Sequence, residues 1–312
     1  MSKTPVAYIV FNRPQHTEKT FAALRKQRPS QLFIIGDGPR AGYPMDIERC
    51  AAVREIVANV DWPCEVHRKY ADSNLGLKTN VSSGLDWVFS QVEQAIVLED
   101  DCVAHPDFFR FCDELLERYV DDERVSVITG NNFQNGQQRG EASYYFSKYN
   151  HCWGWATWRR AWQHYQGDLP FWPEWSQSAD WLKKTPDIVE RRYWTRIFQR
   201  VRAGEIDSWA YPWTCCNWYR GCFSVAPNVN LVSNIGFDAD GTHTKSKNHP
   251  AAGLSINALD SIVHPAQVVI DRNADRYDFD NHFFGKHLRF PHSIFFMIRK
   301  SASFILRKFR KI

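Results

Sequence analysis

Residues 95–102 read AIVLEDDC, in which four apolar residues run directly into three adjacent carboxylates, Glu99, Asp100 and Asp101. The apolar half is typical of a buried strand. Three neighbouring negative charges repel one another, which costs folding energy unless a cation lies close by. The stretch therefore predicts one of two things. It is either a solvated turn that begins the next helix, where acidic residues are favourable, or a strand end that holds a divalent cation.

Strand and helix patterns alternate on both sides of this stretch. Strands are predicted at residues 5–12, 31–35, 65–70, 95–98 and 125–129, and helices at 17–28, 46–59, 77–91 and 105–119. This alternation predicts an α/β fold with a mostly parallel central sheet and helices on both faces. Ligands of such sheets bind beyond the carboxyl ends of the strands. Arg13, Asp37 and the acidic triplet follow three of the predicted strands, so we expect them at that edge.

The rhythm of strands and helices breaks after residue 140. Eleven of the 13 tryptophans lie between Trp153 and Trp218, interleaved with Arg and Lys. We expect several short helices there, whose aromatic rings mainly form core. Residues 1–290 are interpreted as a single domain, with a first half at 1–140 and a Trp-rich half at 141–290, followed by a tail at 291–312.

The charged residues behind the formal net charge of +4 are unevenly distributed along the chain. From Asn281 onward there are eight basic residues and no acidic one, which leaves 31 Lys and Arg against 35 Asp and Glu in the rest of the chain. Proteins that bind duplex nucleic acid usually carry a basic surface on the folded body, so we expect no nucleic-acid partner.

The C-terminal tail has the pattern of a basic amphipathic helix. Its apolar face comprises Ile294, Ile298, Ala302, Ile305, Phe309 and Ile312, with most of the basic residues opposite. Such a helix is typical of a segment that lies on an anionic membrane surface. The alternative is a C-terminal helix that packs on its own domain.

The cysteines and the hydropathy of the chain indicate the cellular compartment in which the protein is expected. The eight cysteines form no CxxC pair and no zinc-like spacing, and no apolar run approaches 18 residues. The first ten residues lack the layout of a signal peptide. We therefore expect free thiols and a cytoplasmic protein, peripheral on the inner face of the plasma membrane through its tail.

The acidic triplet also carries a resemblance. LEDD after an apolar strand resembles the DxD motif of GT-A glycosyltransferases, which use nucleotide sugars. VFNRP (10–14) and GDG (36–38) resemble the nucleotide-binding half of that fold. The chain is similar to family 2 transferases and to N-acetylglucosaminyltransferase I with its bacterial relatives. The resemblance implies that residues 1–140 bind the nucleotide and that residues 141–290 bind the acceptor.

The resemblance implies roles for individual residues. Arg13 is expected near the diphosphate, Asp37 near the base or ribose, and Asp101 on Mn²⁺ or Mg²⁺. Asn74 and Lys78 precede a predicted helix whose N-terminal amides can face phosphate, although an ordinary loop and helix start has the same pattern. The expected donor site comprises Phe11, Arg13, Asp37, Asn74, Lys78, Glu99 and Asp100.

An inverting transfer needs a group that takes the proton of the acceptor hydroxyl. Asp207 lies where the resembling enzymes place this base, and the aromatic residues of DSWAYPW (207–213) are expected to form an apolar wall around it. Asp180 and Glu174 also lie among tryptophans and are alternatives. NIGFDADGTHT (234–244) is similar to a loop that closes over the donor. His243 in this loop is expected to complete the metal shell or touch the diphosphate, unless it is merely solvated.

Together these features imply a metal-dependent, inverting glycosyltransferase. Its cofactor is expected to be Mn²⁺ or Mg²⁺, its donor a nucleoside diphosphate sugar, and its acceptor a saccharide or a lipid-linked one in the synthesis of lipopolysaccharide, capsule or another surface glycan. Two alternatives remain: a metal-dependent nucleotidyl- or phosphotransferase, and a noncatalytic saccharide-binding module. The sequence has no GxGxxG and no GxxxxGK[ST] phosphate-binding loop.

Overall fold

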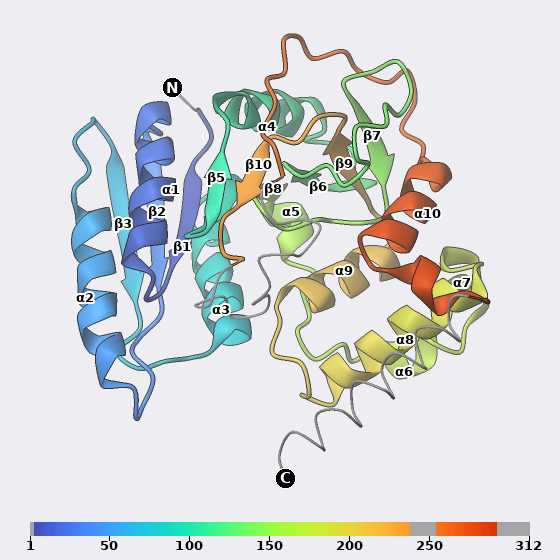
Figure 1. Cartoon of the computed structure of the whole chain (residues 1–312), viewed down its shortest axis with the longest axis horizontal. Helices are drawn as coiled ribbons and strands as arrows, with labels where there is room; N and C mark the ends of the chain where they lie inside the picture. The colour runs from blue at the N-terminus through green and yellow to red at the C-terminus, as the bar shows by residue number, and fades with distance from the viewer. Residues whose placement is uncertain (1–2, 238–253, 292–312) are drawn as a thin grey trace.

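An eight-stranded sheet forms the centre of the computed structural model, which describes residues 3–237 and 254–291 (Figure 1). The strand order is β3-β2-β1-β4-β8-β6-β9-β7. The strands are β1 (Val6–Val10), β2 (Gln31–Gly36), β3 (Glu65–Tyr70), β4 (Gln94–Glu99), β6 (Val125–Thr129), β7 (Tyr144–Ser147), β8 (Trp155–Trp158) and β9 (Phe223–Pro227). Neighbours pair in parallel from β3 to β4 and between β6 and β9, whereas β8 and β7 run antiparallel to their neighbours. The predicted fold class is confirmed.

Helices cover both faces of this sheet because both faces are apolar. In β1, Tyr8 and Val10 pack into the core cluster under α1 (Pro14–Gln27), α2 (Pro44–Ala58) and α4 (Pro106–Arg118). Ala7 and Ile9 point to the opposite face and join the cluster that contains α3 (Leu77–Phe89). Side chains of a strand alternate between the faces, so one short run of sequence supplies both cores.

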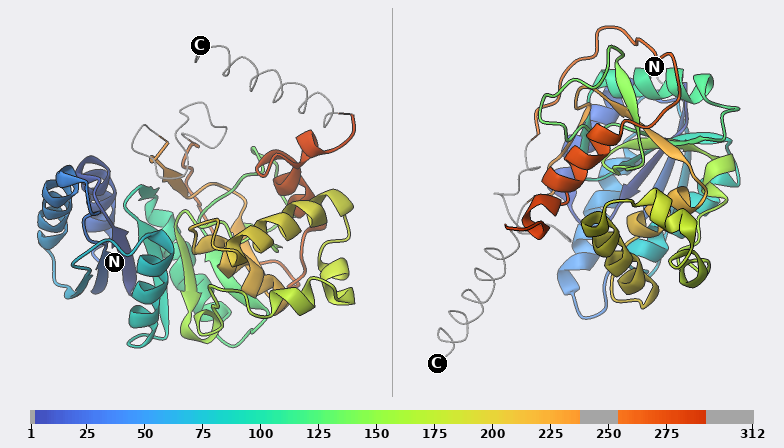
Figure 2. Two further views of the ribbon diagram at one scale, coloured as in Figure 1. Left: turned by 90° about the horizontal axis from the view of Figure 1, so that it is seen from below. Right: turned by 90° about the vertical axis from the view of Figure 1, so that its right-hand side faces the viewer.

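The Trp-rich part of the chain forms α5 (Arg159–Trp162), α6 (Trp172–Trp175), α7 (Ala179–Lys184), α8 (Ile188–Arg202) and α9 (Ala210–Tyr219). The helices α6 to α9 gather as one yellow-green to gold group in Figures 1 and 2. Ten of the eleven tryptophans between Trp153 and Trp218 are at most 6 % exposed, so the expected aromatic core is confirmed.

The expected short helices are present as α5, α6 and α7, but two other elements in this region were not predicted. WATW (155–158) is the strand β8, with Trp155 in one core cluster and Trp158 in the other. Because both faces of β8 are buried, the strand lacks the apolar–polar alternation that marks a half-exposed strand. Helix α8 has 15 residues rather than one or two turns.

Four further elements complete the described chain. β5 (Cys102–Ala104) pairs antiparallel with β10 (Val232–Asn234), which places Asn234 opposite Cys102. Helix α10 (Arg272–Asn281) is followed by a 3₁₀ turn at Gly285–Leu288 and packs against β7. The ribbon of β5 and β10 lies directly after the acidic triplet, so it borders the predicted site.

The described residues leave some predictions outside their range. The amphipathic face of the tail, with its expected anionic membrane partner, and His243 fall within residues 292–312 and 238–253, which are not described. Among the described helices, none is long and apolar enough to cross a membrane. All eight cysteines have free thiols.

Candidate functional site

The carboxyl ends of β1, β2 and β4 meet at one edge of the sheet because these strands are parallel neighbours. Arg13 follows β1, Asp37 follows β2, and the acidic triplet begins at the last residue of β4. All of them line one pocket with a volume of about 760 Å³. The structure thus brings together residues that are up to 88 positions apart in the sequence.

Most of the predicted site residues line this pocket. Lys78 does not: its ammonium group pairs with Asp168 at 3.0 Å. The alternative bases Glu174 and Asp180 are exposed and lie outside the pocket lining. The predicted residues that line the pocket are Phe11, Arg13, Asp37, Asn74, Glu99, Asp100, Asp101 and Asp207.

Arg13 provides a cation between the carboxylates. Its Nη1 lies 3.0 Å from Oδ2 of Asp101, and its Nη2 pairs with Oδ1 of Asp100. The backbone amide of Phe11 donates to the other oxygen of Asp100 at 3.2 Å. Burial works against the charge of Arg13, but the two carboxylates outweigh it and raise the pKa of the guanidinium. The counter-charge that the triplet requires is therefore present in the protein itself.

Asp101 is held by the ribbon of β5 and β10. Asn234 donates to its Oδ1 at 3.1 Å, and the amide of Ile235 donates to its backbone carbonyl at 2.8 Å. Gly236 lies so close that an added Cβ would be 2.4 Å from Oδ2 of Asp101, so a larger residue there would displace this carboxylate. Asp101 is thereby fixed at the pocket wall.

A divalent cation fits this site if one protein carboxylate is joined by ligands from water and a bound substrate. Within residues 3–237 and 254–291, no three His, Cys, Asp or Glu side chains converge on a common point. Mg²⁺ and similar ions are often bound by one or two carboxylates, with water and substrate phosphates completing the shell. Asp101 is 13 % exposed at its side chain and can supply such a carboxylate. The donor set therefore suits a cation that arrives with a phosphate-bearing ligand.

The other two members of the triplet hold protons more strongly than ordinary carboxyl groups. Burial, together with the charges of Asp101 and Asp100, raises the pKa of Glu99 to about 8, against the opposing effects of Arg13 and of a hydrogen bond with Trp209. Burial also raises the pKa of Asp100, although Arg13 opposes the shift. Negative charge in the unliganded pocket is therefore lower than the three carboxyl groups suggest.

Asp37 is anchored at the end of β2 by three hydrogen bonds. The amides of Gly38 and Leu75 donate to its Oδ1 at 2.8 Å each, and Asn74 donates to its Oδ2 at 2.9 Å. Burial raises the pKa of Asp37, while the backbone donors oppose the rise. Asn74, expected beside a phosphate, thus holds Asp37 in the unliganded protein.

Asp207 lies at the rim of the pocket and is exposed to solvent. Its Oδ1 accepts a hydrogen bond of 3.1 Å from the amide of Lys78, in the first turn of α3. The predicted apolar wall around Asp207 is not found. Trp209 and Trp213 lie four residues apart at the start of α9, which turns both into the core, and Asp207 precedes that helix.

The wall at the β8 end of the pocket, opposite the Asp37 end, was not predicted from the sequence. Residues 149–153 line the pocket together with His282 and Phe283 after α10. His151 is 7 % exposed, and its Nε2 lies 3.0 Å from Oδ2 of Asp278, which is fully buried. The two residues are 127 positions apart, and no spacing in the sequence indicates that they meet.

A buried charge network supports this wall. Lys148 pairs with Glu190 at 2.7 Å, and its amide donates to Asp275 at 3.2 Å. Ser147 donates to the same oxygen of Asp275 at 2.6 Å. Burial raises the pKa of Asp275 to about 7, although Lys148 and Ser147 oppose the rise.

This network predicts a pH dependence of stability. Folded Asp275 keeps its proton to about pH 7, whereas an aspartate in the unfolded chain loses it near pH 3.9. The folded state then binds more protons, so the free energy of unfolding falls with rising pH across this window, by up to about 1.4 kcal/mol per pH unit. Asp275→Asn should flatten the dependence, measured by urea unfolding at pH 5 and pH 7.5. An equally steep dependence in the variant would contradict the assignment.

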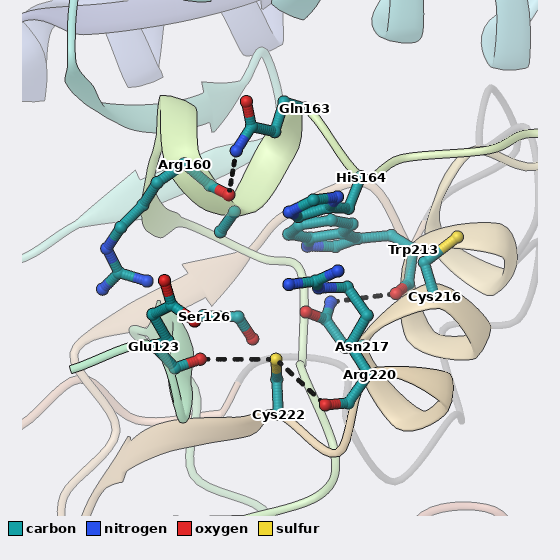
Figure 3. A pocket seen from close by; sticks show the side chains of 11 residues that line it. Glu123, Ser126, Arg160, Gln163, His164, Trp213, Cys216, Asn217, Arg220 and Cys222 are labelled. Atoms are coloured by element: carbon teal, nitrogen blue, oxygen red, sulfur yellow. Dashed lines mark hydrogen bonds between the residues drawn. The ribbon is translucent and has the colours of Figure 1, made fainter. Parts of the chain in front are cut away.

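A second, smaller cavity of about 60 Å³ shares no lining residue with the pocket (Figure 3). Its wall includes Arg160, whose guanidinium donates to the backbone carbonyls of Tyr119 and Val120 at 2.7 Å each. Cys222 donates to the carbonyl of Glu123 at 3.6 Å. These contacts tie the chain after α4 to the sheet, so this cavity has a structural explanation.

Comparison with known proteins found no matching family model and no matching curated protein. Among solved structures, the chain is similar to the mannosyltransferase PcManGT from Pyrobaculum calidifontis in complex with GDP-Man and Mn²⁺. The match has 11 % identity and a TM-score of 0.35, over 51 % of this chain and 45 % of that one. The chain thus spans less than half the length of that mannosyltransferase.

Nucleotidyltransferase-type structures match to a similar extent. One is 4-diphosphocytidyl-2C-methyl-D-erythritol synthase from Anaerococcus prevotii, with 10 % identity and a TM-score of 0.32 over 57 % of this chain and 78 % of that one. Another is HddC from Yersinia pseudotuberculosis complexed with GMP-PN, with 9 % identity and a TM-score of 0.32 over 55 % and 86 %. Because these TM-scores are low, the similarities do not indicate which reaction is catalysed. The reaction is inferred from the pocket instead.

Proposed function

We propose that the protein is a metal-dependent, inverting glycosyltransferase of the GT-A type. The observation that carries the proposal is the meeting of Arg13, Asp37 and the acidic triplet at the carboxyl ends of three parallel strands. This edge is where open α/β sheets bind their ligands. The pocket volume of about 760 Å³ lies within the range of small-molecule sites and can accommodate a nucleotide sugar.

The residues at the different strand ends are suited to different parts of the donor. Asp37, anchored by Leu75 and Gly38, presents a carboxylate suited to the hydroxyls of a ribose or to the donors of a base. Arg13 is a planar donor that can bind phosphate oxygens when a diphosphate competes with its carboxylate partners. Mn²⁺ or Mg²⁺ bound at Asp101 would neutralise the negative charge of the leaving diphosphate.

The opposite wall suits an acceptor. Trp153 is partly buried, lines the pocket and contacts the rings of Phe133 and Phe237 edge-on at 5.3 Å each. Aromatic faces of this kind stack on the apolar faces of sugars, which supports a saccharide or lipid-linked acceptor. Asp207 at the rim is the group to which the resemblance assigns proton removal.

The biological setting that we propose follows from the sequence. The acceptor belongs to a surface glycan such as lipopolysaccharide or capsule, and the protein acts in the cytoplasm at the inner face of the plasma membrane. The eight basic residues from Asn281 onward, without an acidic one, support an anionic surface as the partner of the tail.

The function is tested with a panel of nucleotide sugars in the presence and absence of Mn²⁺. A ligand at a hundred times its Kd stabilises the folded state by about 2.7 kcal/mol, so the correct donor should raise the Tm by several degrees, and only with the metal. Nucleoside monophosphates serve as controls. Glycosyl transfer releases a nucleoside diphosphate. Release of pyrophosphate would instead identify a nucleotidyltransferase, and the absence of stabilisation by any donor would contradict the proposal.

A further inference from the structure

The pocket wall contains an imidazole–carboxylate pair that the proposed reaction has not yet used. His151 lines the pocket, and its Nε2 lies 3.0 Å from Asp278, which is fully buried. The imidazole is also packed edge-on against Phe133 at 4.5 Å between ring centroids. A histidine that is this closely packed has one orientation.

Asp278 also fixes which nitrogen of His151 carries a proton. The other oxygen of Asp278 accepts a hydrogen bond of 2.5 Å from Gln134, so both oxygens have partners on the pocket side of α10. An ionised carboxylate only accepts, and therefore Nε2 of His151 must donate. In the neutral imidazole Nδ1 is then the proton acceptor. Within the described residues, no hydrogen bond to Nδ1 is found.

The pair lies close to the acidic triplet. The next residue, Cys152, also lines the pocket. Burial raises the pKa of its thiol, and the charges of Glu99 and Asp101 raise it further, which places the 151–152 backbone within electrostatic reach of the triplet. His151 therefore lines the same pocket as the acidic triplet.

Asp207 meets these requirements less well. It is exposed at the rim, and one of its oxygens accepts a hydrogen bond from the amide of Lys78 at the start of α3. Gly76, two residues after Asn74, lines the same pocket, and a Cβ added there would be 3.3 Å from Oδ2 of Asp207. Asp207 is therefore positioned to fix the start of α3 on the nucleoside side rather than to reach the acceptor.

We propose that His151, oriented by Asp278, is the catalytic base that accepts the proton of the acceptor hydroxyl. The assignment rests on the proposed glycosyl transfer. In this step the acceptor oxygen bonds to the anomeric carbon and its proton moves to Nδ1 of His151. The bond from the anomeric carbon to the diphosphate oxygen breaks, and its electron pair leaves with the nucleoside diphosphate. Asp278 is a positioning residue that stabilises the imidazolium.

The titratable groups around His151 are few. Asp278 faces it from α10, and His282 faces it after that helix at 5.2 Å between ring centroids. Tyr149 and Cys152 flank it on its own segment. A general base accepts a proton only in its unprotonated form, so turnover should fall as the pH is lowered.

The test uses His151→Gln, because the glutamine amide can keep the hydrogen bond to Asp278 and removes only the basic nitrogen. With the nucleotide sugar that stabilises the wild type in Mn²⁺, the variant should keep the donor-dependent rise in Tm. Its release of nucleoside diphosphate should fall by about 10²–10⁴-fold, the usual contribution of general base catalysis. The acidic limb of the pH profile should disappear in the variant.

Three further variants complete the test. Asp278→Asn should lower kcat and shift the acidic limb while leaving KM for the donor unchanged, an effect that a purely structural role would not produce. His164→Gln, a histidine on the smaller cavity, is the matched control and should retain full activity. Asp207→Asn should impair donor binding rather than remove the acidic limb.

The outcomes separate the assignment from the function. Full turnover in His151→Gln, or loss of turnover and of the acidic limb in Asp207→Asn with donor binding intact, overturns the assignment alone. A wild-type protein that no nucleotide sugar stabilises overturns the proposed function, and the assignment falls with it. A His151→Gln variant that still binds the donor is folded, so its loss of turnover reports on chemistry.

Discussion

Arg13→Gln is expected to lower the free energy of unfolding by about 3–5 kcal/mol, because it leaves a buried carboxylate without its counter-charge. The side chain of Asp100 is only 3 % exposed and that of Arg13 only 14 %. The loss should be greater at pH 8 than at pH 5. Without Arg13 the raised pKa of Asp100 rises further, so the folded variant favours the protonated acid and loses stability as the pH increases. Chemical denaturation at both values measures the effect.

Two controls make this result specific. Arg276→Gln removes an arginine that is 71 % exposed and lies 3.9 Å from Asp280, and it should change stability by less than about 1 kcal/mol. The double variant Arg13→Gln with Asp100→Asn should recover part of the lost stability, since it removes both charges of the pair. If the two substitutions instead add their costs, the ion pair is not the reason for the destabilisation.

Asp101→Asn is expected to abolish the metal-dependent stabilisation by the donor. Asparagine keeps the size of the side chain but loses the charge that makes a carboxylate a good ligand for a hard cation. At a donor concentration of a hundred times the wild-type Kd, the loss amounts to the whole of about 2.7 kcal/mol. The comparison is the rise in Tm with donor and Mn²⁺ in both proteins.

Asp180→Asn is the matched control for this prediction. Asp180 is exposed, pairs with Lys183 at 3.3 Å, and lies outside the pocket lining. Its variant should respond to donor and metal as the wild type does. A normal metal-dependent response in Asp101→Asn would show that the triplet does not hold the cation.

The parts of the fold that could be predicted are those with a local pattern. The strands at 65–70 and 125–129 were predicted with the observed bounds, because helix and turn patterns separate them from the rest of the chain. β8 was missed because both of its faces are buried, and three of its four residues are tryptophan or threonine. The sequence of a fully buried strand does not show which face is which.

The candidate site divides in the same way. The donor side could be located because each of its residues directly follows a strand, and parallel strands end at one edge. The opposite wall could not, since Asp278 reaches His151 only through the packing of α10 on β7. Long-range contacts of this kind depend on the tertiary fold and have no periodic trace in the sequence.

The ribbon of β5 and β10 has a consequence for how tightly the site can bind a ligand. Because Asn234, the amide of Ile235 and the bare backbone of Gly236 all abut Asp101, this carboxylate has little rotational freedom left to lose. An incoming donor then meets a ligand group whose entropy was already given up when the chain folded. Substitutions in the ribbon should therefore make Asp101 more mobile and weaken the affinity for the donor, even where the substituted residue contacts no ligand atom.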